Sequence, residues 1–308
     1  MYYPYLRGRQ NELLAIKDLL SEGRLSDKVI PIIEPVKLSP TLVNTLDLFN
    51  QKQHPIVLIW NPQVGAFADD ANNTKNQKYL DKLKGVLSVE NIIRGIIINN
   101  DTSEMVSRWR QRGISDNQII SICINPDSVK YYEETFSSPV KTVLPYSSSF
   151  RRIRADRILL EDKFNKKSKN SDYQDMPDEF FSFDHRYFSE EGFVGFSDYS
   201  VIGEEYSETG FAPFAVTIHI VYFDSDKNLR IHHFVSDDND DISDPANKFY
   251  QALSHLVEWN KITQINTKAI NEFKRIYDEQ SYPGLGVVKK ISLMNHLELV
   301  GMFLDGKI

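Results

Sequence analysis

Short apolar runs that end on polar residues recur along this chain of 308 residues. The first run, VIPIIEPVK at 29–37, carries one carboxylate, Glu34. Seven further runs follow, and the polar residues in or after them include Asn61, Asn99, Asn125, Tyr146, Glu161, Asp198 and His219. The segments between the early runs have helical spacing, as at 11–22, 40–51, 75–87 and 102–112. Near-continuous strands rich in Ile and Val, separated by helices, predict a parallel sheet with crossover helices.

This alternation predicts an α/β fold, a TIM-type (β/α)₈-like barrel that is irregular in its C-terminal third. The tight turn at 225–228 predicts an added antiparallel hairpin between 215–223 and 229–235. We expect residues 1–9 to plug one end of the barrel and the aromatic segment 176–187 to form a helix. No linker marks a boundary, so one barrel-like domain over 1–308 is expected. It would comprise an N-terminal segment and helix at 1–28 and a helical tail at 236–308 packed on the barrel.

Composition narrows the class of protein. Hydrophobic residues make up 41% and charged residues 26% of the chain, which is typical of a globular protein and excludes wholesale disorder. A lone cysteine, Cys123, cannot form an internal disulfide, and the N-terminus lacks the layout of a signal peptide. No apolar run approaches the roughly 18 residues of a membrane helix. We therefore expect a cytoplasmic protein with no membrane contact.

Strand-end carboxylates are the main candidates for chemistry. In a (β/α)₈ barrel the carboxyl ends of the strands converge on one face, where catalytic residues gather. Glu34, Glu161 and Asp198 would then point into one mouth, as ligands of Mg²⁺ or Mn²⁺ or as an acid and base. The alternative is that polar residues end strands because they cap the next helix or turn. The three carboxylates are the predicted catalytic residues, and the metal is not identified.

Candidate ligand-binding residues come from several parts of the chain. The strand-end amides Asn61, Asn99 and Asn125 would line the same mouth as the carboxylates. Basic residues cluster at 151–169, where Arg151 and Arg152 could meet phosphate or could pair with the chain's own acids. His219 could form an acid–base or metal pair with His232 or His233 if they are cross-strand neighbours. The complete set of predicted ligand-binding residues is Arg7, Arg9, Asn61, Asn99, Asn125, Arg151, Arg152, Tyr199, Glu205 and His219.

Recognised catalytic motifs are absent from the sequence. It has no Walker loop, no G-x-G-x-x-G and no G-x-S-x-G, and its histidines lack zinc-site spacing. The segment YPGLGVVKK resembles a phosphate-binding turn only in part, although Lys289 and Lys290 add positive charge at a helix start. We interpret it as a loop. Cys123 lies within a predicted strand and is expected to be an inert core residue.

Two parts of the chain carry recognisable motifs. The first is MYYPYLRGRQNELLAIKDL followed by PIIEPVK, and the second comprises FSDYSVIGEEYSETG, AVTIHIVYF, HHFVSDD and YPGLGVVKK. Together they resemble the Beta-protein family of bacteria and phages. The resemblance implies a barrel-like protein associated with phage defence or mobile elements, in places beside a nuclease-like companion. It supplies no catalytic set to carry over. The residues within the matching motifs are Arg7, Arg9, Glu12, Glu34, Asp198, Tyr199, Glu205 and Tyr206.

Two functions follow as hypotheses. The first is a component of a bacterial defence or mobile-element module that binds a phosphate-bearing ligand or a partner protein through the barrel mouth. The second is a metal-dependent phosphoester hydrolase that uses the three carboxylates. A companion protein encoded nearby is the expected partner, and nucleic acid is a weaker candidate because the net charge of the chain is −7. The sequence predicts no oligomeric state.

Overall fold

The computed structural model describes residues 1–87, 91–208 and 213–308, so Thr209 and Gly210 of the FSDYSVIGEEYSETG motif lie outside the described residues. Within the described chain, contacts group the residues into two compact units. Unit 1 comprises Met1–Leu13, Asp27–Glu161 and Asp184–Asp198, and unit 2 comprises Leu14–Ser26, Asp162–Phe183 and Tyr199–Ile308. The expectation of one domain over 1–308 stays a prediction.

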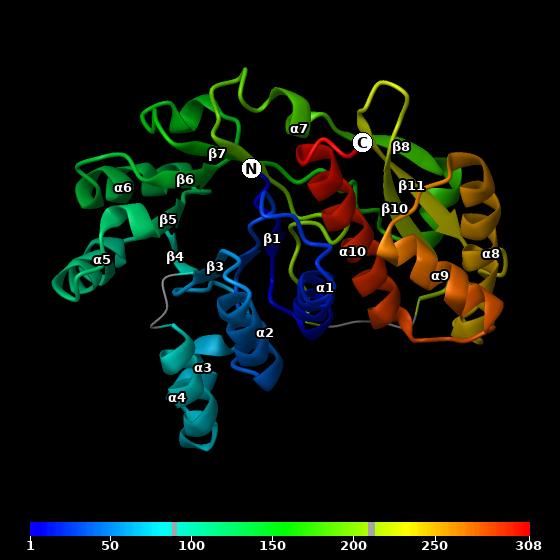
Figure 1. The fold of residues 1–308 in the computed structure, drawn as a ribbon, viewed down its shortest axis with the longest axis horizontal. Coiled ribbons are helices and arrows are strands. Elements are labelled where there is room, and N and C mark those ends of the chain that lie inside the picture. The colour runs from blue at the N-terminus through cyan, green and yellow to red at the C-terminus, as the bar shows by residue number, and fades with distance from the viewer. Residues whose placement is uncertain (88–90, 209–212) are drawn as a thin grey trace. The chain divides into compact units, whose positions relative to one another are not determined.

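Unit 1 is built around eight parallel strands (Figure 1). They are β1 (Tyr5–Leu6), β2 (Ile32–Ile33), β3 (Ile56–Ile59), β4 (Ile92–Ile97), β5 (Ile119–Ile122), β6 (Lys141–Leu144), β7 (Arg157–Leu160) and β9 (Gly195–Ser197). A parallel bridge between Tyr2 and Phe196 joins the last strand to the first. The sheet is therefore a nearly closed barrel, and the predicted TIM-type α/β fold is confirmed.

Helices and short 3₁₀ turns connect these strands. They are α2 (Pro40–Gln51), α3 (Phe67–Asn72), η1 (Thr74–Asn76), α4 (Gln77–Val86), α5 (Thr102–Gln111), η2 (Asp116–Gln118), η3 (Pro126–Ser128), α6 (Val129–Thr135), η4 (Ser148–Phe150) and α7 (Asp184–Tyr187). The start of α2 shows how the sequence sets a boundary. Ser39 accepts a hydrogen bond from the Leu42 N–H, and Pro40 occupies the first turn, where no N–H is required.

The N-terminal segment differs from the prediction. Instead of plugging the barrel, it supplies strand β1, whose residues Tyr5 and Leu6 pair with Ile32 and Ile33. The run AVTIHIVYFD, predicted to form a hairpin with 229–235, belongs to another sheet. β1 is only two residues long and includes a tyrosine, so its sequence lacks the apolar run by which the other strands were recognised.

The two faces of the barrel strands can be distinguished by packing. A Cβ on Gly195 would lie 2.6 Å from the Tyr3 ring. The face of the strands that carries Gly195 and Tyr3 is therefore crowded, and we assign it to the inside of the barrel. On the opposite face, Trp60 packs edge-on against Trp109 of α5, and Phe196 packs against Phe188. Side chains alternate between faces along a strand, and parallel partners share a face. The strand registers therefore assign Glu34, two residues after Ile32, to the inner face.

Unit 2 contains a three-stranded antiparallel sheet in the order β10 (Thr217–Phe223), β11 (Leu229–Val235), β8 (Asp178–Ser182). The predicted hairpin is confirmed, since Thr217 pairs with Val235 and Phe223 with Leu229. The helix expected at 176–187 is wrong. Its first half forms β8, and only Asp184–Tyr187 is helical.

The C-terminal helices α8 (Pro245–Thr263), α9 (Lys268–Asp278) and α10 (Leu285–Leu304) belong to unit 2, as does η5 (Asn170–Asp175). Helix α1 (Gln10–Ser21) has its first residues in unit 1 and the rest in unit 2. In Figure 1, α10 lies beside β10, and the Asn295 amide donates to the carbonyl of Val221 at 2.7 Å. α10 is apolar on nearly all sides and is mostly buried, as expected for a helix at the centre of a core.

Candidate ligand-binding site

A cavity of about 780 Å³ lies within unit 2. It is lined by η5 and the residues before it, by the start of β10 and by the first two turns of α10. The lining residues are Ser168, Lys169, Asn170, Ser171, Pro213, Phe214, Ala215, Thr217, Asn239, Leu285, Gly286, Val288 and Lys289. Two lysines but no Asp or Glu occur among these described residues, although the chain carries a net charge of −7. The cavity is therefore a cationic site in an acidic protein.

The N-terminus of α10 supplies part of this wall. Gly284 precedes the helix with φ +87°, a conformation that L side chains rarely adopt, and no atom crowds its missing Cβ. The glycine is therefore required by the backbone turn rather than by lack of space. The first N–H groups of any α-helix have no partner within the helix, and its aligned dipoles favour negative charge there. Leu285 and Gly286 place this end of the helix at the cavity.

Phe214 and Ala215 form an apolar part of the same wall. The Phe214 side chain is 57% exposed, and Val288 adds a buried apolar residue from α10. Asn170 is anchored close by, because its amide donates to the Ala215 carbonyl at 2.8 Å. The Thr217 hydroxyl donates to the Asn170 carbonyl at 3.1 Å. The cavity thus combines fixed polar groups with an exposed aromatic surface, as ligand-binding pockets commonly do.

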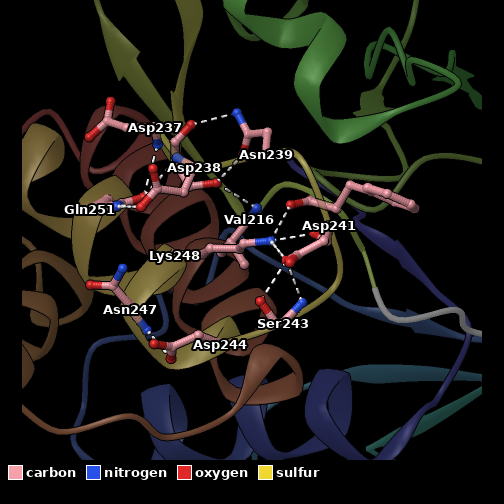
Figure 2. A network of polar contacts seen from close by, with 12 residues as sticks. Val216, Asp237, Asp238, Asn239, Asp241, Ser243, Asp244, Asn247, Lys248 and Gln251 are labelled. Atoms are coloured by element: carbon pink, nitrogen blue, oxygen red, sulfur yellow. Dashed lines mark hydrogen bonds and ion pairs between the residues drawn. The ribbon is translucent and has the colours of Figure 1, made fainter.

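A buried lysine holds the segment with Phe214 before β10 and the loop with Asn239 after β11 (Figure 2). Lys248 of α8 is only 3% exposed, and its ammonium group donates to the Phe214 carbonyl at 2.8 Å. The same group donates to the backbone carbonyl of Asp241 and lies 3.5 Å from the Asp241 carboxylate. Because a buried ammonium requires such partners, Lys248 fixes both chain segments against α8.

The acidic loop before α8 is held by hydrogen bonds within the loop and to the start of α8, and it lies against Lys248 (Figure 2). Asp244 caps α8 by accepting from the Asn247 N–H at 3.0 Å, and Asp241 accepts from the Ser243 N–H at 2.8 Å. The Ser236 hydroxyl donates to Asn239 at 2.6 Å and accepts from the Val216 N–H at 3.0 Å. Asp241 and Asp244 therefore have structural roles in this loop, and Asn239 lines the cavity.

Two histidines and a carboxylate form a hydrogen-bonded chain in the adjoining sheet. His219 and His233 are cross-strand partners with their Nδ1 atoms 2.7 Å apart, and His233 Nε2 lies 3.1 Å from Glu179 Oε1. An ionised carboxylate can only accept, so Nε2 of His233 carries hydrogen. Neutral His233 then accepts at Nδ1, and His219 donates from its own Nδ1. This leaves Nε2 of His219 as an acceptor.

Burial keeps this pair neutral. It is the first cause of the lowered pKa of His219, followed by the repulsion of His233 and of Lys289. The pKa of His233 is also lowered by burial, against the opposing effect of Glu179. His219 lies two residues after Thr217 on the same face of β10, so the chain of imidazoles begins near the cavity wall. The sequence indicated the histidine pair but missed Glu179, because β8 was predicted as helix.

The three predicted catalytic carboxylates all follow barrel strands, but their side chains differ in direction. Glu34 is fully buried on the inner face, where it accepts from the Tyr5 hydroxyl at 2.8 Å, from the Gln63 N–H at 2.7 Å and from the Arg7 guanidinium. The registers assign Asp198 and Glu161 to the outer face, and Asp198 accepts from the Tyr2 hydroxyl at 2.7 Å. Their catalytic assignment stays a prediction.

The strand-end amides make backbone contacts. Asn61 exchanges hydrogen bonds with the backbone of Ile97 on the neighbouring strand β4, at 2.7 Å to its carbonyl and 2.9 Å from its N–H. Asn99 accepts from the Asp101 N–H and Asn125 from the Asp127 N–H, each at 3.0 Å. Asn99 and Asn125 thus have the turn and cap roles weighed as the alternative to ligand binding, whereas Asn61 joins two strands.

The other predicted ligand-binding residues are dispersed. Arg9 lies close enough to Glu12 for its charge to act on that carboxyl, whereas exposed Glu205 pairs with Lys166 at 2.6 Å. Tyr199 is buried, and Arg152 pairs with Glu133 at 2.7 Å. Arg151 lines a second pocket in unit 1. Through the described part of the chain, no group of three or more His, Cys, Asp or Glu side chains is placed to hold a metal ion.

Comparison with known proteins identifies no family for this chain. No protein-family model matches the chain, and no curated protein matches it either. Among the described residues, no helix is both long and apolar enough to cross a membrane.

Proposed function

We propose that this protein binds a phosphate-bearing small molecule in the unit 2 cavity. The observation that carries the proposal is that Lys169, just before η5, and Lys289, in the second turn of α10, line one cavity that has no carboxylate among its described lining residues. Lysine ammonium groups and helix N-termini are recurrent partners of phosphate. The volume of about 780 Å³ lies within the range of pockets that take cofactor-sized ligands.

The barrel mouth is less suited to an anion than the sequence suggested. Arg7, the basic residue predicted there, already lies against the buried carboxylate of Glu34, so its charge is offset. The unit 2 cavity has its own lysines and the exposed ring of Phe214. We therefore locate the predicted ligand function in unit 2 and expect the ligand to carry an apolar or aromatic part beside its phosphate.

Calorimetric titration with pyrophosphate and with ATP tests the proposal, and neighbouring lysines provide a matched control. Lys289 lines the cavity, whereas Lys290 instead donates to Asp18 at 2.6 Å. We expect saturable binding, weakened about tenfold, or about 1.4 kcal/mol, by Lys289→Ala and by Lys169→Ala. Lys290→Ala removes the same charge and should leave affinity within about twofold. Failure of the wild type to bind either probe, or an equal loss in Lys290→Ala, would refute the proposal.

We further propose that the protein acts in the cytoplasm as a component of a phage-defence or mobile-element module. Support comes from the resemblance to the Beta-protein family and from the single cysteine. A plaque assay on a host that carries the intact module tests this role. Replacing the wild type with Lys169→Ala/Lys289→Ala should abolish protection, while Lys290→Ala should retain it. Equal plaque counts with and without the wild-type module would contradict the role.

A further inference from the structure

The connection between β6 and β7 leaves part of the barrel's outer surface open. It contains only the short η4 turn (Ser148–Phe150), whereas α5 and α6 cover the two preceding connections. A pocket of about 380 Å³ lies here within unit 1. Its polar and aromatic lining is contributed by Tyr146, Ser147, Ser148, Arg151, Arg157 and Phe193. A helix in this connection would have occupied the surface that the pocket exposes.

Two arginines give this pocket its charge. The Arg157 guanidinium lies over the Phe193 ring, 4.6 Å from its centre, and donates to the Gly192 carbonyl at 3.3 Å. Its Nε atom is buried and has no hydrogen-bond partner among the described residues. Across the described chain, neither Arg157 nor Arg151 forms an ion pair, whereas Arg152, next to Arg151, pairs with Glu133. The pocket therefore holds two positive charges that no carboxylate offsets.

An aromatic ring stands beside these charges. Tyr146 is 63% exposed, and its ring is tilted against Phe193 with centres 5.9 Å apart. Exposed aromatic rings next to arginine are the platform on which proteins stack single bases. Ser147 accepts from the Ser149 N–H at 3.2 Å, which leaves its hydroxyl hydrogen able to donate to a ligand. The pocket thus pairs a stacking surface with phosphate-binding groups.

We propose that this pocket binds a nucleoside phosphate, with the base stacked on Tyr146 and the phosphate held by Arg151 and Arg157. The volume of about 380 Å³ accommodates one nucleotide. The ligand is either a free mononucleotide or the terminal nucleotide of a single strand, since both present the same base and phosphate. This site is separate from the cavity of unit 2 and does not depend on the function proposed there.

Titration in the Lys169→Ala/Lys289→Ala background tests the site, because a signal from the other cavity is then reduced. The probes are AMP, adenosine, inorganic phosphate and a 5′-phosphorylated single-stranded hexamer. We expect AMP or the hexamer to bind in a saturable manner and more tightly than adenosine or phosphate, since those carry only one of the two groups. AMP binding identifies a free nucleotide as the ligand, and binding of the hexamer alone identifies a strand end.

Substitutions separate this site from non-specific charge. Tyr146→Ala and Arg151→Ala should each weaken binding about tenfold, whereas Tyr146→Phe keeps the ring and should bind as the parent does. Arg152→Ala is the control, because Arg152 adjoins the pocket in sequence but pairs with Glu133. The proposal is overturned if neither AMP nor the hexamer binds, or if Arg152→Ala costs as much affinity as Arg151→Ala.

Discussion

The guanidinium of Arg7 forms an ion pair with the carboxylate of Glu34 on the inner face of the barrel. Glu34 is fully buried, and only 14% of the Arg7 side chain is exposed. Both residues belong to the sequence motifs that resemble the Beta-protein family, and both were predicted to act on a ligand. In the structure the two side chains form an ion pair with each other, and this pair joins the N-terminal segment to the end of β2.

Breaking this pair should destabilise the protein strongly. Arg7→Met leaves the Glu34 carboxylate buried with only its neutral donors, which should lower the free energy of unfolding by about 3–5 kcal/mol. The control is Arg108→Met, which breaks the exposed pair with Glu104 and should cost less than about 1 kcal/mol. Urea denaturation at pH 7 measures both. If Arg7→Met and Arg108→Met lower the free energy of unfolding by the same small amount, the Arg7 charge does not stabilise the buried Glu34 carboxylate.

Lys248 provides a second stability test, because its partners include two backbone carbonyls besides the exposed Asp241 carboxylate. Lys248→Met keeps the apolar stem but leaves the carbonyls of Phe214 and Asp241 without this donor, at a cost of about 1–3 kcal/mol. Lys261→Met on the same helix removes only an exposed pair with Glu258 and should be nearly neutral. Amide hydrogen exchange should also become faster across 236–244 in Lys248→Met alone. Unchanged exchange there would contradict the role of Lys248 in fixing the loop.

Most of the fold could be predicted because each parallel strand except β1 lies in an apolar run followed by polar residues. The hairpin of unit 2 could also be predicted, since the turn at Ser225–Asn228 separates two segments in which apolar and polar residues alternate. β8 was misassigned because its aromatic residues fit either periodicity over so short a length. In the structure Phe180 is 49% exposed and Phe181 is buried, as strand alternation requires.

The candidate site was harder to predict, because its parts are distant in sequence and have ordinary residue types. Lys169 and Lys289 are 120 positions apart, and only the fold of unit 2 brings them to one cavity. Two of the partners of Lys248 are backbone carbonyls, which no side-chain pattern reveals. Glycines and lysines at the start of α10 were noticed in the sequence, but the cavity that gives them a role depends on tertiary structure.

Glu12 should make stability depend on pH. Burial raises its pKa from 4.5 to about 7, against the opposing charge of Arg9 and the backbone N–H groups of Arg7 and Arg9. A folded-state pKa above the unfolded value means that the folded state binds the proton more tightly. Stability from this group is therefore fully present below pH 4.5 and is lost as the pH rises to about 7. At about 1.4 kcal/mol per pKa unit, the loss is about 3 kcal/mol.

The variant Glu12→Gln removes this dependence. It should be more stable than the wild type by up to about 3 kcal/mol at pH 8 and indistinguishable from it near pH 4.5. Glu104→Gln is the control, since Glu104 holds the same first-turn position on α5 but is exposed. That change should stay within about 0.5 kcal/mol across the range. Urea denaturation from pH 4.5 to 8 measures the free energy of unfolding of both proteins. If it changes with pH in the same way in wild type and Glu12→Gln, the raised pKa of Glu12 is refuted.

The histidine pair should show fixed and opposite tautomers. His233 carries its hydrogen on Nε2, toward Glu179, and His219 carries its hydrogen on Nδ1, toward His233. Long-range ¹H–¹⁵N spectra at pH 7.5 should identify these two forms. Glu179→Leu removes the acceptor of His233 Nε2–H, so the two tautomers should no longer be fixed, whereas Glu179→Gln can still accept through its carbonyl oxygen and should keep them. Because burial lowers the pKa of both rings, protonation stays unfavourable in the fold, and their contribution to stability is lost only as the pH falls below about 6.5. Charged rings at pH 7.5, or tautomers that stay fixed in Glu179→Leu, would contradict this chain of donors.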